Sequence, residues 1–382
     1  MDLTLSEEQQ QLRDLAREWV EREVVPHATE WDRVEQVDPK IVGKLAELGF
    51  LGLGIAESDG GSGGDFLDYA LVMEELGRGD TSVRGIVSVT LGLVTKTVQA
   101  YGTEEQKRHW LPRLCSGETI GCFALTEPGT GSDAGNLVTR AVRDGDDWLI
   151  SGEKIFITNG TWAGVALVFA RTGDPGPRGV SAFLVPTDRE GFGRREIKGK
   201  LGLRGQATAE LSLDRVRVSD SERLGPAGDG FKIAMKALDK GRIAVASGSV
   251  GLARACLEAA VAYAGERTQF GKPIAAHQLV QEMIAEMAVE TDAARLLVWR
   301  AADLVDRGQP FRTAASMAKL FASEAAVKAA NQAIQVFGGY GYVDEFPVGK
   351  FMRDARVQTL YEGTSQIQKL LIGRALTGIS AF

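Results

Sequence analysis

One acidic residue near the end of the chain, Glu362, stands in a segment of small and polar residues, YEGTSQIQK (361–369). A carboxylate can act as a general base when its surroundings are apolar, because burial raises its pKa. A glutamate that precedes a glycine also commonly ends a turn or begins a helix. The rest of the chain must therefore decide between a catalytic and a structural role for Glu362.

A turn in the middle of the chain, LTEPGTGSD (125–133), is rich in hydrogen-bond donors. Gly129 and Gly131 leave backbone N–H groups exposed, and Thr130 and Ser132 add hydroxyl groups. Such a loop can bind a pyrophosphate or the polar edge of a ring. An ordinary Pro-Gly turn is the structural alternative.

A second segment, KIFITNG (154–160), alternates apolar and functional side chains at strand spacing. Ile155 and Ile157 fall on one face, while Phe156 and Thr158 fall on the other. An aromatic ring beside a hydroxyl suits a flat heteroaromatic cofactor. The alternative is an ordinary strand end.

Two segments in the C-terminal part also contain groups that can bind phosphate. RTQFGKPIAAHQ (267–278) places Arg267, Gln269 and Gln278 near a turn between two helices, where an arginine can clamp a phosphate or simply lie in solvent. QVFGGYGY (335–342) has glycines that permit close backbone approach or a helix C-cap.

The elements that must position these residues change type twice along the chain. Capping boxes at Ser6 and Thr103, an Asp38-Pro39 helix start and helical periodicity predict helices up to about residue 117, interrupted by the glycine-rich loop 57–65. From Thr119, β-branched and aromatic runs separated by turn residues predict strands at 120–125, 137–143, 148–157, 165–170, 180–185 and 211–218.

After Gly230 the pattern is helical again, with alanine-rich stretches near 231–264, 276–306, 312–337 and 364–376 that indicate a bundle. The order helix, strand, helix favours the α+β class over a doubly wound fold. We expect an N-terminal all-α domain (1–118), a middle β domain of sandwich or barrel type (119–228) and a C-terminal four-helix bundle (229–382).

Composition narrows the function. The chain has 382 residues, 44% of them hydrophobic, and a net charge of −7, which argues against nucleic acid and anionic membranes as partners. No apolar run reaches about 18 residues, and the acidic start MDLTLSEEQQ is not typical of a signal peptide. The few cysteines and histidines, without metal-ligand spacing, predict no metal site and a reducing, cytoplasmic location: Cys115, Cys122, Cys256, His27, His109 and His277.

Taken in this order and at these spacings, LTEPGTGSD, KIFITNG, RTQFGKPIAAHQ, QVFGGYGY and RDARVQTLYEGTSQIQK resemble the acyl-CoA dehydrogenase family across essentially the whole chain. The resemblance implies the same helix, strand and bundle arrangement. It implies FAD bound between the β domain and the bundle, electron-transferring flavoprotein as electron acceptor, and a homotetramer in which a neighbouring subunit completes each FAD site.

The resemblance also assigns roles to individual residues. Phe156 is expected against the isoalloxazine ring and Thr158 near its N5 atom, although many relatives have Trp at the Phe156 position. The full set of expected FAD contacts is Phe123, Leu125, Thr126, Gly131, Ser132, Phe156, Ile157, Thr158, Arg267, Gln269, Phe270, Gln278, Gln335, Phe337, Gly338, Gly339, Thr364 and Gln366.

The family's chemistry assigns Glu362 as the base that removes the α proton of an acyl-CoA thioester while the β hydrogen leaves as hydride. Relatives with a catalytic Glu on the bundle helix place it at the position of Gly241, which cannot act. The expected substrate contacts are Arg84, Ser88, Ser132, Asp239, Arg242, Tyr361 and Gly363.

Arg84 carries the prediction of substrate. It interrupts the uncharged stretch GDTSVRGIVSV (79–89), and its spacing to Ser88 resembles the glutaryl-CoA dehydrogenase branch. A buried arginine needs an anion, which favours a C5 to C6 dicarboxylyl-CoA such as glutaryl- or adipyl-CoA. A protein carboxylate beside Arg84, or an exposed Arg84, is the alternative; Gly77 stands where that branch has a pocket Glu, so decarboxylation stays open.

Other functions remain possible from the residues alone. An acyl-CoA oxidase would pass electrons to oxygen and release peroxide. A non-catalytic acyl-CoA-binding homologue would lack turnover, and an acyl group on a carrier protein is a further candidate substrate.

Overall fold

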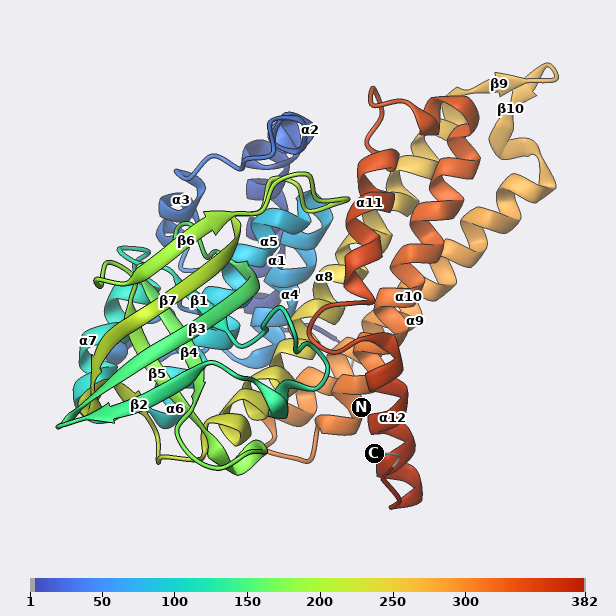
Figure 1. Ribbon diagram of the computed structural model, residues 1–382. Coiled ribbons are helices and arrows are strands. Elements are labelled where there is room, and N and C mark those ends of the chain that lie inside the picture. Colours follow the sequence, from blue (N-terminus) through green and yellow to red (C-terminus); the bar gives the residue numbers. More distant parts are fainter. Residues whose placement is uncertain (1–3, 381–382) are drawn as a thin grey trace.

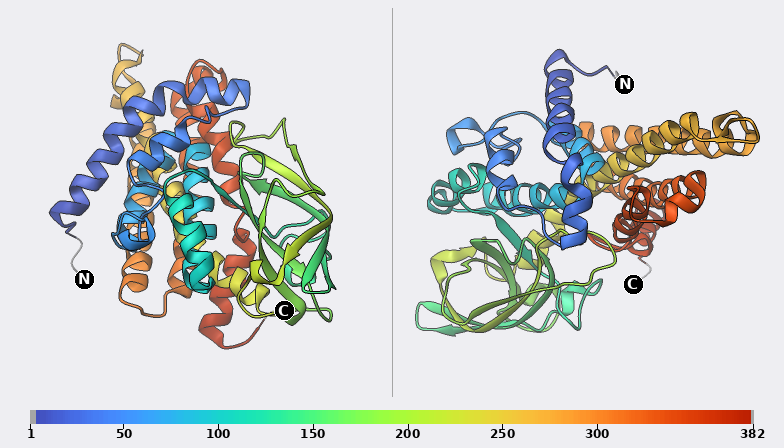
Figure 2. Two further views of the ribbon diagram at one scale, coloured as in Figure 1. Left: turned by 90° about the vertical axis from the view of Figure 1, so that its left-hand side faces the viewer. Right: turned by 90° about the horizontal axis from the view of Figure 1, so that it is seen from above.

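The computed structural model describes residues 4–380. Residues 1–3, which begin the acidic N-terminal segment, and residues 381–382 lie outside the described residues. The chain forms a group of N-terminal helices, a twisted β-sheet and a C-terminal helical bundle (Figure 1). Seen from above in Figure 2, the sheet lies to one side of both helical parts. The predicted α+β arrangement is confirmed.

The N-terminal helices follow their predicted caps closely. The side chains of Ser6 and Gln9, and those of Thr103 and Gln106, form complete capping boxes. A second short helix after the first was not predicted. The helices are α1 (Glu7–Glu23), α2 (Val25–Val34), α3 (Ile41–Glu47), α4 (Phe66–Gly79), α5 (Thr81–Val87), α6 (Lys96–Tyr101) and α7 (Glu104–Cys115).

Between α5 and α6 the helix widens into a π-helical segment, η2 (Ser88–Thr95). A π-helix holds more residues per turn than an α-helix and is frequent at functional sites. Asn159 supports it from the β domain: its fully buried side-chain amide donates to the Ile86 carbonyl at 3.3 Å and to the Thr90 hydroxyl at 3.2 Å.

The middle domain is an antiparallel-rich sheet in the order β6-β7-β3-β2-β4-β5-β8, with β1 parallel to β4. All six predicted strands are present, and β6 and β8 are additional, because their polar or very short sequences give little strand signal. The strands are β1 (Gly121–Ala124), β2 (Arg140–Asp144), β3 (Asp147–Thr158), β4 (Val165–Arg171), β5 (Val180–Pro186), β6 (Phe192–Glu196), β7 (Thr208–Ser219) and β8 (Arg223–Leu224).

The C-terminal part is built on three long helices and a fourth, interrupted one. The helix that precedes residues 361–369 was not predicted from the sequence. The segment 267–278 contains a small hairpin (Figure 1). The elements are α8 (Gly230–Glu266), β9 (Thr268–Gln269), β10 (Lys272–Pro273), α9 (Gln278–Asp306), α10 (Arg312–Phe337), α11 (Val348–Gln358) and α12 (Ser365–Thr377).

Helix α8 lies at the centre of the molecule and contacts α4, η2, β5, α9 and α10. Among residues 4–380 it is the one helix whose length and apolar composition would suffice to cross a membrane. However, 78% of its most apolar window is buried inside the protein. Its apolar surface is therefore that of a core helix of a soluble protein.

Candidate active site

The turn between α11 and α12 carries Glu362. Its backbone is left-handed, with φ of 50° at Glu362 and 94° at Gly363. Left-handed φ is unfavourable for a glutamate and persists only where the surroundings hold it. Two features close the turn: the Ser365 N–H donates to the Thr359 carbonyl at 3.0 Å, and the Thr364 side chain caps α12.

The Glu362 carboxylate points toward α8. Its Oε2 atom is buried and has no hydrogen-bond partner among residues 4–380. A Cβ atom on Gly241 would collide with this oxygen, so a larger residue there would push the carboxylate out of its present position. Burial raises the pKa of Glu362, while the positive charges of Arg84, Lys319 and Arg242 oppose that rise. Glu362 is thus a half-buried residue whose Oε2 atom is buried without a hydrogen bond, next to three cations from different helices.

Arg84 lies beside this turn. Its side chain is 1% exposed and donates to the Tyr361 hydroxyl, which in turn donates to the Gln358 amide oxygen at 2.6 Å. Within residues 4–380 no carboxylate lies within 4.0 Å of the guanidinium, and its Nε has no hydrogen-bond partner. Arg84 is therefore not exposed to solvent and forms no ion pair within 4.0 Å among the described residues, although the Glu362 carboxylate is near enough for the charges of the two groups to interact.

Glycines let Arg84 lie flat against α8. A Cβ atom on Gly248 would come within 3.0 Å of both Cδ and Nε of Arg84. On the other side, a Cβ on Gly77 of α4 would overlap the Gly248 carbonyl oxygen. A glutamate at position 77 would not fit this helix contact without moving α4 from α8. Ser88, one turn beyond Arg84, is buried, and its hydroxyl has no hydrogen-bond partner in the described part of the chain.

The predicted CoA-facing residues lie on α8 on either side of Gly241. The Asp239 carboxylate forms two ion pairs, one with Arg242 and one with Arg312 of α10, each at 2.6 Å. Arg312 was not predicted from the sequence. Arg242 is buried and its Nε has no partner in the described residues, so part of its donor capacity is available to a ligand.

Phe156 forms the face of the β domain that was expected to contact the flavin. It has a left-handed φ of 58° where the pairing of β3 with β7 shifts register. Such bulges turn a side chain out of the sheet. As a result Phe156 is 66% exposed while its neighbour Ile157 is buried. The Thr158 hydroxyl lies 3.4 Å from the Gln206 amide oxygen.

The predicted cofactor loop 125–133 is held by a buried ion pair. Lys154 donates to the Glu127 carboxylate at 2.8 Å and to the Leu125 carbonyl at 3.1 Å, and Glu127 accepts from two backbone N–H groups at residues 138 and 139. Beyond this anchor Gly131 and Ser132 are exposed, and a Cβ on Gly131 would meet no atom within 4 Å. The start of the loop, at Leu125 and Thr126, continues from Phe123 near the end of β1 and is less exposed. The Thr126 carbonyl accepts a hydrogen bond from a backbone N–H of β3 at 3.0 Å.

These surroundings fit FAD. An exposed ring, a nearby hydroxyl and an open donor loop on one edge of the sheet match a flat ring joined to a pyrophosphate.

The remaining expected FAD contacts lie elsewhere. The β9–β10 hairpin and the end of α10 are at the end of the bundle opposite to α12 (Figure 1). Phe270 is 93% exposed there, and the Arg267 guanidinium lies 5.5 Å from the centre of the Tyr340 ring. One chain does not bring this group to Phe156; it consists of Arg267, Gln269, Phe270, Gln278, Gln335, Phe337, Gly338 and Gly339.

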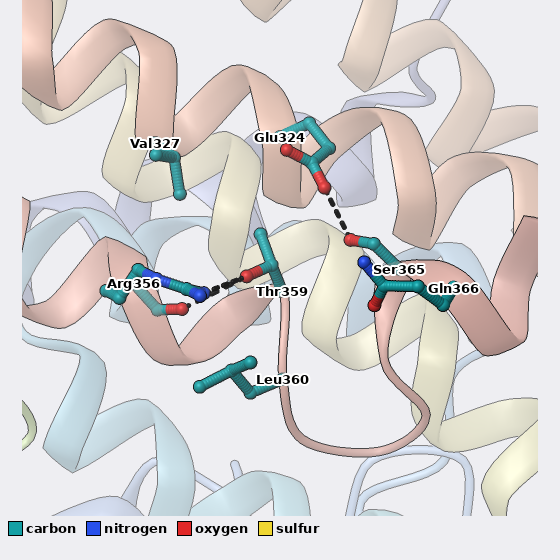
Figure 3. Close-up of a pocket in the computed structure, with 7 residues that line it drawn as sticks. All are labelled: Glu324, Val327, Arg356, Thr359, Leu360, Ser365 and Gln366. Atoms are coloured by element: carbon teal, nitrogen blue, oxygen red, sulfur yellow. Dashed lines mark hydrogen bonds between the residues drawn. The ribbon is translucent and has the colours of Figure 1, made fainter.

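Gln366 lines a small cavity of about 170 Å³ beside the turn of Glu362 (Figure 3), and Thr364, the other expected contact in this turn, caps α12. In Figure 3, Glu324 of α10 reaches across the cavity and accepts from the Ser365 hydroxyl at 2.5 Å. Arg356 and Thr359 form the opposite wall. Val327 and Leu360 add apolar surface, so the lining of the cavity is mixed.

Several residues around Glu362 were missed because each lies in an ordinary helical pattern. Lys319 and Gln368 both donate to the Gly363 carbonyl, at 2.9 Å and 3.1 Å. A signal for Lys319 was present: it is a lone cation on the buried alanine face of α10, between Ala315 and Ala322. Nothing comparable marks Gln368.

Comparison with known proteins identifies the family. Three family models for acyl-CoA dehydrogenases match consecutive parts of the chain: the N-terminal domain at residues 6–118, the middle domain at 122–216 and the C-terminal domain at 228–377. The chain belongs to the acyl-CoA dehydrogenase family. The predicted membership is confirmed, and with it an FAD-dependent flavoprotein oxidoreductase that acts on acyl-CoA.

Individual acyl-CoA dehydrogenases resemble the chain over nearly its full length. It is 44% identical to an acyl-CoA dehydrogenase of Bacillus subtilis (strain 168) over 98% of this chain and 99% of the relative. It is 45% identical to the short-chain specific mitochondrial enzyme of Homo sapiens over 96% of this chain and 90% of the relative.

Two solved structures are also similar. Butyryl-CoA dehydrogenase from Megasphaera elsdenii has a TM-score of 0.96 at 40% identity, covering 98% of this chain and 100% of its own. A glutaryl-CoA dehydrogenase from Mycobacterium smegmatis in complex with FADH2 has a TM-score of 0.95 at 36% identity. The match covers 99% of this chain and 96% of that enzyme's chain.

Proposed function

We propose that this acyl-CoA dehydrogenase removes the α and β hydrogens of a short acyl-CoA that ends in a carboxylate, with Glu362 as the base. Glutaryl-CoA and adipyl-CoA are the candidate substrates. The observation that carries the substrate class is Arg84, a buried guanidinium that forms no ion pair within 4.0 Å among residues 4–380.

The proposed chemistry begins with the α proton of the thioester, which is weakly acidic. The backbone N–H of Glu362 would donate to the thioester carbonyl oxygen as negative charge develops there. The Glu362 carboxylate, buried and without a hydrogen bond at Oε2, would take the proton. When bound, FAD supplies the acceptor for the β hydride. Phe156 and Thr158 would hold the ring, and the loop with Gly131 and Ser132 its phosphates.

The distal end of the substrate would meet Arg84. An unpaired buried cation is costly, so the site is incomplete without an anion. The Arg84 guanidinium is fixed by Tyr361 on one side and by the backbone of Gly248 on the other. A carboxylate reaching it could also accept from the unpartnered Ser88 hydroxyl.

Three further properties belong to the same proposal. We expect electron-transferring flavoprotein as the acceptor, a homotetramer (a dimer of dimers) in solution, and a cytoplasmic location. The separation of the hairpin at residues 267–273 from Phe156 supports the shared FAD site of such an assembly.

The test is a substrate panel with a dye as electron acceptor. We expect kcat/KM for glutaryl- or adipyl-CoA to exceed that for butyryl- and hexanoyl-CoA. A preference for the unbranched monocarboxylates would reject the substrate class, and peroxide formation during turnover would indicate an oxidase instead.

Arg84→Met provides the matched variant. Loss of a charge-assisted contact costs roughly 1.5–3 kcal/mol, so kcat/KM for the dicarboxylyl substrate should fall about 10- to 100-fold. The value for butyryl-CoA should stay the same or rise, because the cavity becomes apolar. An equal loss with both substrates would show that Arg84 acts on the fold or the turn rather than on the distal carboxylate.

A further inference from the structure

A buried lysine supports the turn of Glu362 from the neighbouring helix. Lys319 of α10 is 0% exposed, and its ammonium donates to the Gly363 carbonyl at 2.9 Å. No carboxylate lies within 4.0 Å of it among residues 4–380. A buried ammonium without an ion pair is as costly as the unpaired Arg84, and it stands outside the set of groups that the proposed reaction uses.

The place of this lysine relative to the turn is specific. Gly363 follows Glu362 directly, so a bond to its carbonyl holds the Gly363–Thr364 peptide group, one peptide beyond the base. Gln368 donates to the same oxygen at 3.1 Å, and a Cβ on Gly363 would come within 2.5 Å of the Gln368 amide nitrogen. Glu324, also on α10, holds the far side of the turn through Ser365. Helix α10 thus contacts the turn at two points, Gly363 and Ser365, both on the side of α12.

We propose that Lys319 is a positioning residue for the general base, which holds the turn of Glu362 and keeps a positive charge beside its carboxylate. The inference rests on the proposed role of Glu362. Gln368 makes the same hydrogen bond without a charge, so the chain itself offers the control that separates geometry from electrostatics.

Few charged groups surround Glu362 and Lys319. Facing Glu362 are Arg84 of α5, Arg242 of α8 and Lys319 of α10, together with the hydroxyls of Tyr69 and Tyr361. Facing Lys319 are Glu362, Arg242 and Glu324. Burial lowers the pKa of Lys319 to about 8, while Glu362 raises it. Lys319 therefore stays mostly charged below that pH, where the base needs support to remain ionised.

Loss of the Lys319 charge should change the pKa of Glu362 in one direction, upward. Burial raises the pKa of Glu362, and each cation lowers it again. Removing the Lys319 charge lets the pKa of Glu362 rise further, so the base becomes protonated at a higher pH. The acid limb of the kcat profile should therefore move toward alkaline pH.

The experiment compares Lys319→Met, Lys319→Gln and Gln368→Met. Lys319→Gln keeps a hydrogen-bond donor and loses only the charge. We expect both lysine variants to move the acid limb of kcat up by about one pH unit, the usual size for loss of a nearby opposite charge. Gln368→Met should lower kcat without moving the limb. Lys319→Gln carries the test if Lys319→Met fails to fold.

An infrared titration keeps this test independent of substrate. The stretch of the protonated Glu362 carboxyl, assigned by its absence in Glu362→Gln, should appear at higher pH in both lysine variants of the purified flavoprotein. Unchanged pH midpoints in both would overturn the inference. A shifted infrared midpoint in a protein that turns over no acyl-CoA would uphold the role of Lys319 and reject the proposed function instead.

Discussion

At the scale of single residues, Glu362 combines two unfavourable features. Its φ of 50° is left-handed, and its Oε2 is buried without a hydrogen bond. Strained backbone of this kind costs about 1–3 kcal/mol and is found mostly where function requires it. Three separate helices contribute cations around it, which no ordinary turn would need. These observations favour a reactive carboxylate over a helix-start residue.

Glu362→Gln tests that assignment. The amide fills the same volume but cannot accept the α proton, so flavin reduction by acyl-CoA should fall by several orders of magnitude, about 10³-fold or more. FAD content and thermal unfolding should remain those of the wild type. Rapid-mixing absorbance of the flavin measures the rate, and near-normal reduction would remove Glu362 from the mechanism.

The pH dependence of the wild type provides a second test of Glu362. Burial raises the pKa of its carboxyl above the usual 4.5, and the base acts only when deprotonated. Activity should therefore fall as the pH drops through this raised pKa, at a pH where an exposed glutamate would still be ionised. The kcat profile at saturating acyl-CoA measures it, and a profile flat down to the ordinary range of a glutamate would contradict it.

The sequence motifs identified Glu362, Arg84 and Phe156 because each stands in a segment with an unusual local pattern. Lys319 and Gln368 could not be found in the same way, since their function depends on which carbonyl they meet in three dimensions. The same holds for Gly248, whose importance comes only from the side chain of Arg84 lying on it.

At the scale of secondary-structure elements, helices α4 and α8 approach through glycine. A Cβ on Gly77 would overlap backbone atoms of Gly248, which cannot move as a flexible side chain can. The contact sets the distance between the helix that leads to Arg84 and the helix that carries Gly241. The depth of the proposed acyl site therefore depends on this pair.

Gly77→Ala should destabilise the protein by about 1–3 kcal/mol, the usual cost of overpacking, despite the higher helix propensity of alanine. Gly43→Ala is the matched control, because Gly43 is also helical and a Cβ there would meet no atom within 4 Å. The control should be neutral or more stable by up to about 1 kcal/mol. Denaturant unfolding measures both; equal effects would show that α4 and α8 can separate freely.

A buried ion triad joins three elements near the start of α5. Lys350 of α11 pairs with Asp80 at 2.7 Å and with Asp354 at 2.6 Å. Asp80 also caps α5, and Asp354 accepts from the Leu203 N–H at 2.7 Å. The triad thereby links the helix of Arg84 to the bundle and to the loop before β7.

Lys350→Met should cost about 3–5 kcal/mol, because it leaves two buried carboxylates without a cation. Lys232→Met is the control: its pair with Asp229 is largely exposed, at 61% and 39%, and should be worth at most about 1 kcal/mol. Thermal and denaturant unfolding compare them. Equal losses would mean that the triad does not hold α5 and α11 together.

Elements were predicted best where the local period was strong. The long helices α8, α9 and α10 and the six predicted strands are confirmed within a few residues. Helix α11 was missed because charged and apolar residues in VGKFMRDARVQ give a short pattern directly before the catalytic segment. The strand β6 was missed because FGRRE is polar and lies at the edge of the sheet.

At the scale of the whole molecule, the expected FAD contacts fall into two groups that one chain keeps apart. Phe156, Thr158 and the 125–133 loop lie on the sheet, and Arg267 with Phe270 lies on the far hairpin. The proposed homotetramer would bring the hairpin of one subunit to the sheet of another. In that proposed assembly, FAD binding would depend on the contact between subunits.

Subunit mixing tests this dependence. Arg267→Ala should lower FAD retention, and both Arg267→Ala and Glu362→Gln should have little activity as homo-oligomers. Co-expressed tetramers should recover part of the activity, because some sites combine an intact Glu362 with an intact Arg267 from the neighbour. Normal FAD retention in Arg267→Ala, or no recovery in isolated mixed oligomers, would contradict a shared site.

The π-helical segment Ser88–Thr95 determines where this part of the chain can lose a residue without turning the helices on either side. A π turn accommodates one residue more than the α turn it replaces, as an insertion would. Deleting one residue between 88 and 95 should restore an α-helix while leaving the flanking helices in phase, whereas a deletion inside α5 would rotate Arg84 by about 100° about the helix axis. Single-residue insertions and deletions are therefore tolerated at this point of the chain, next to Ser88, more readily than elsewhere in the helices around it.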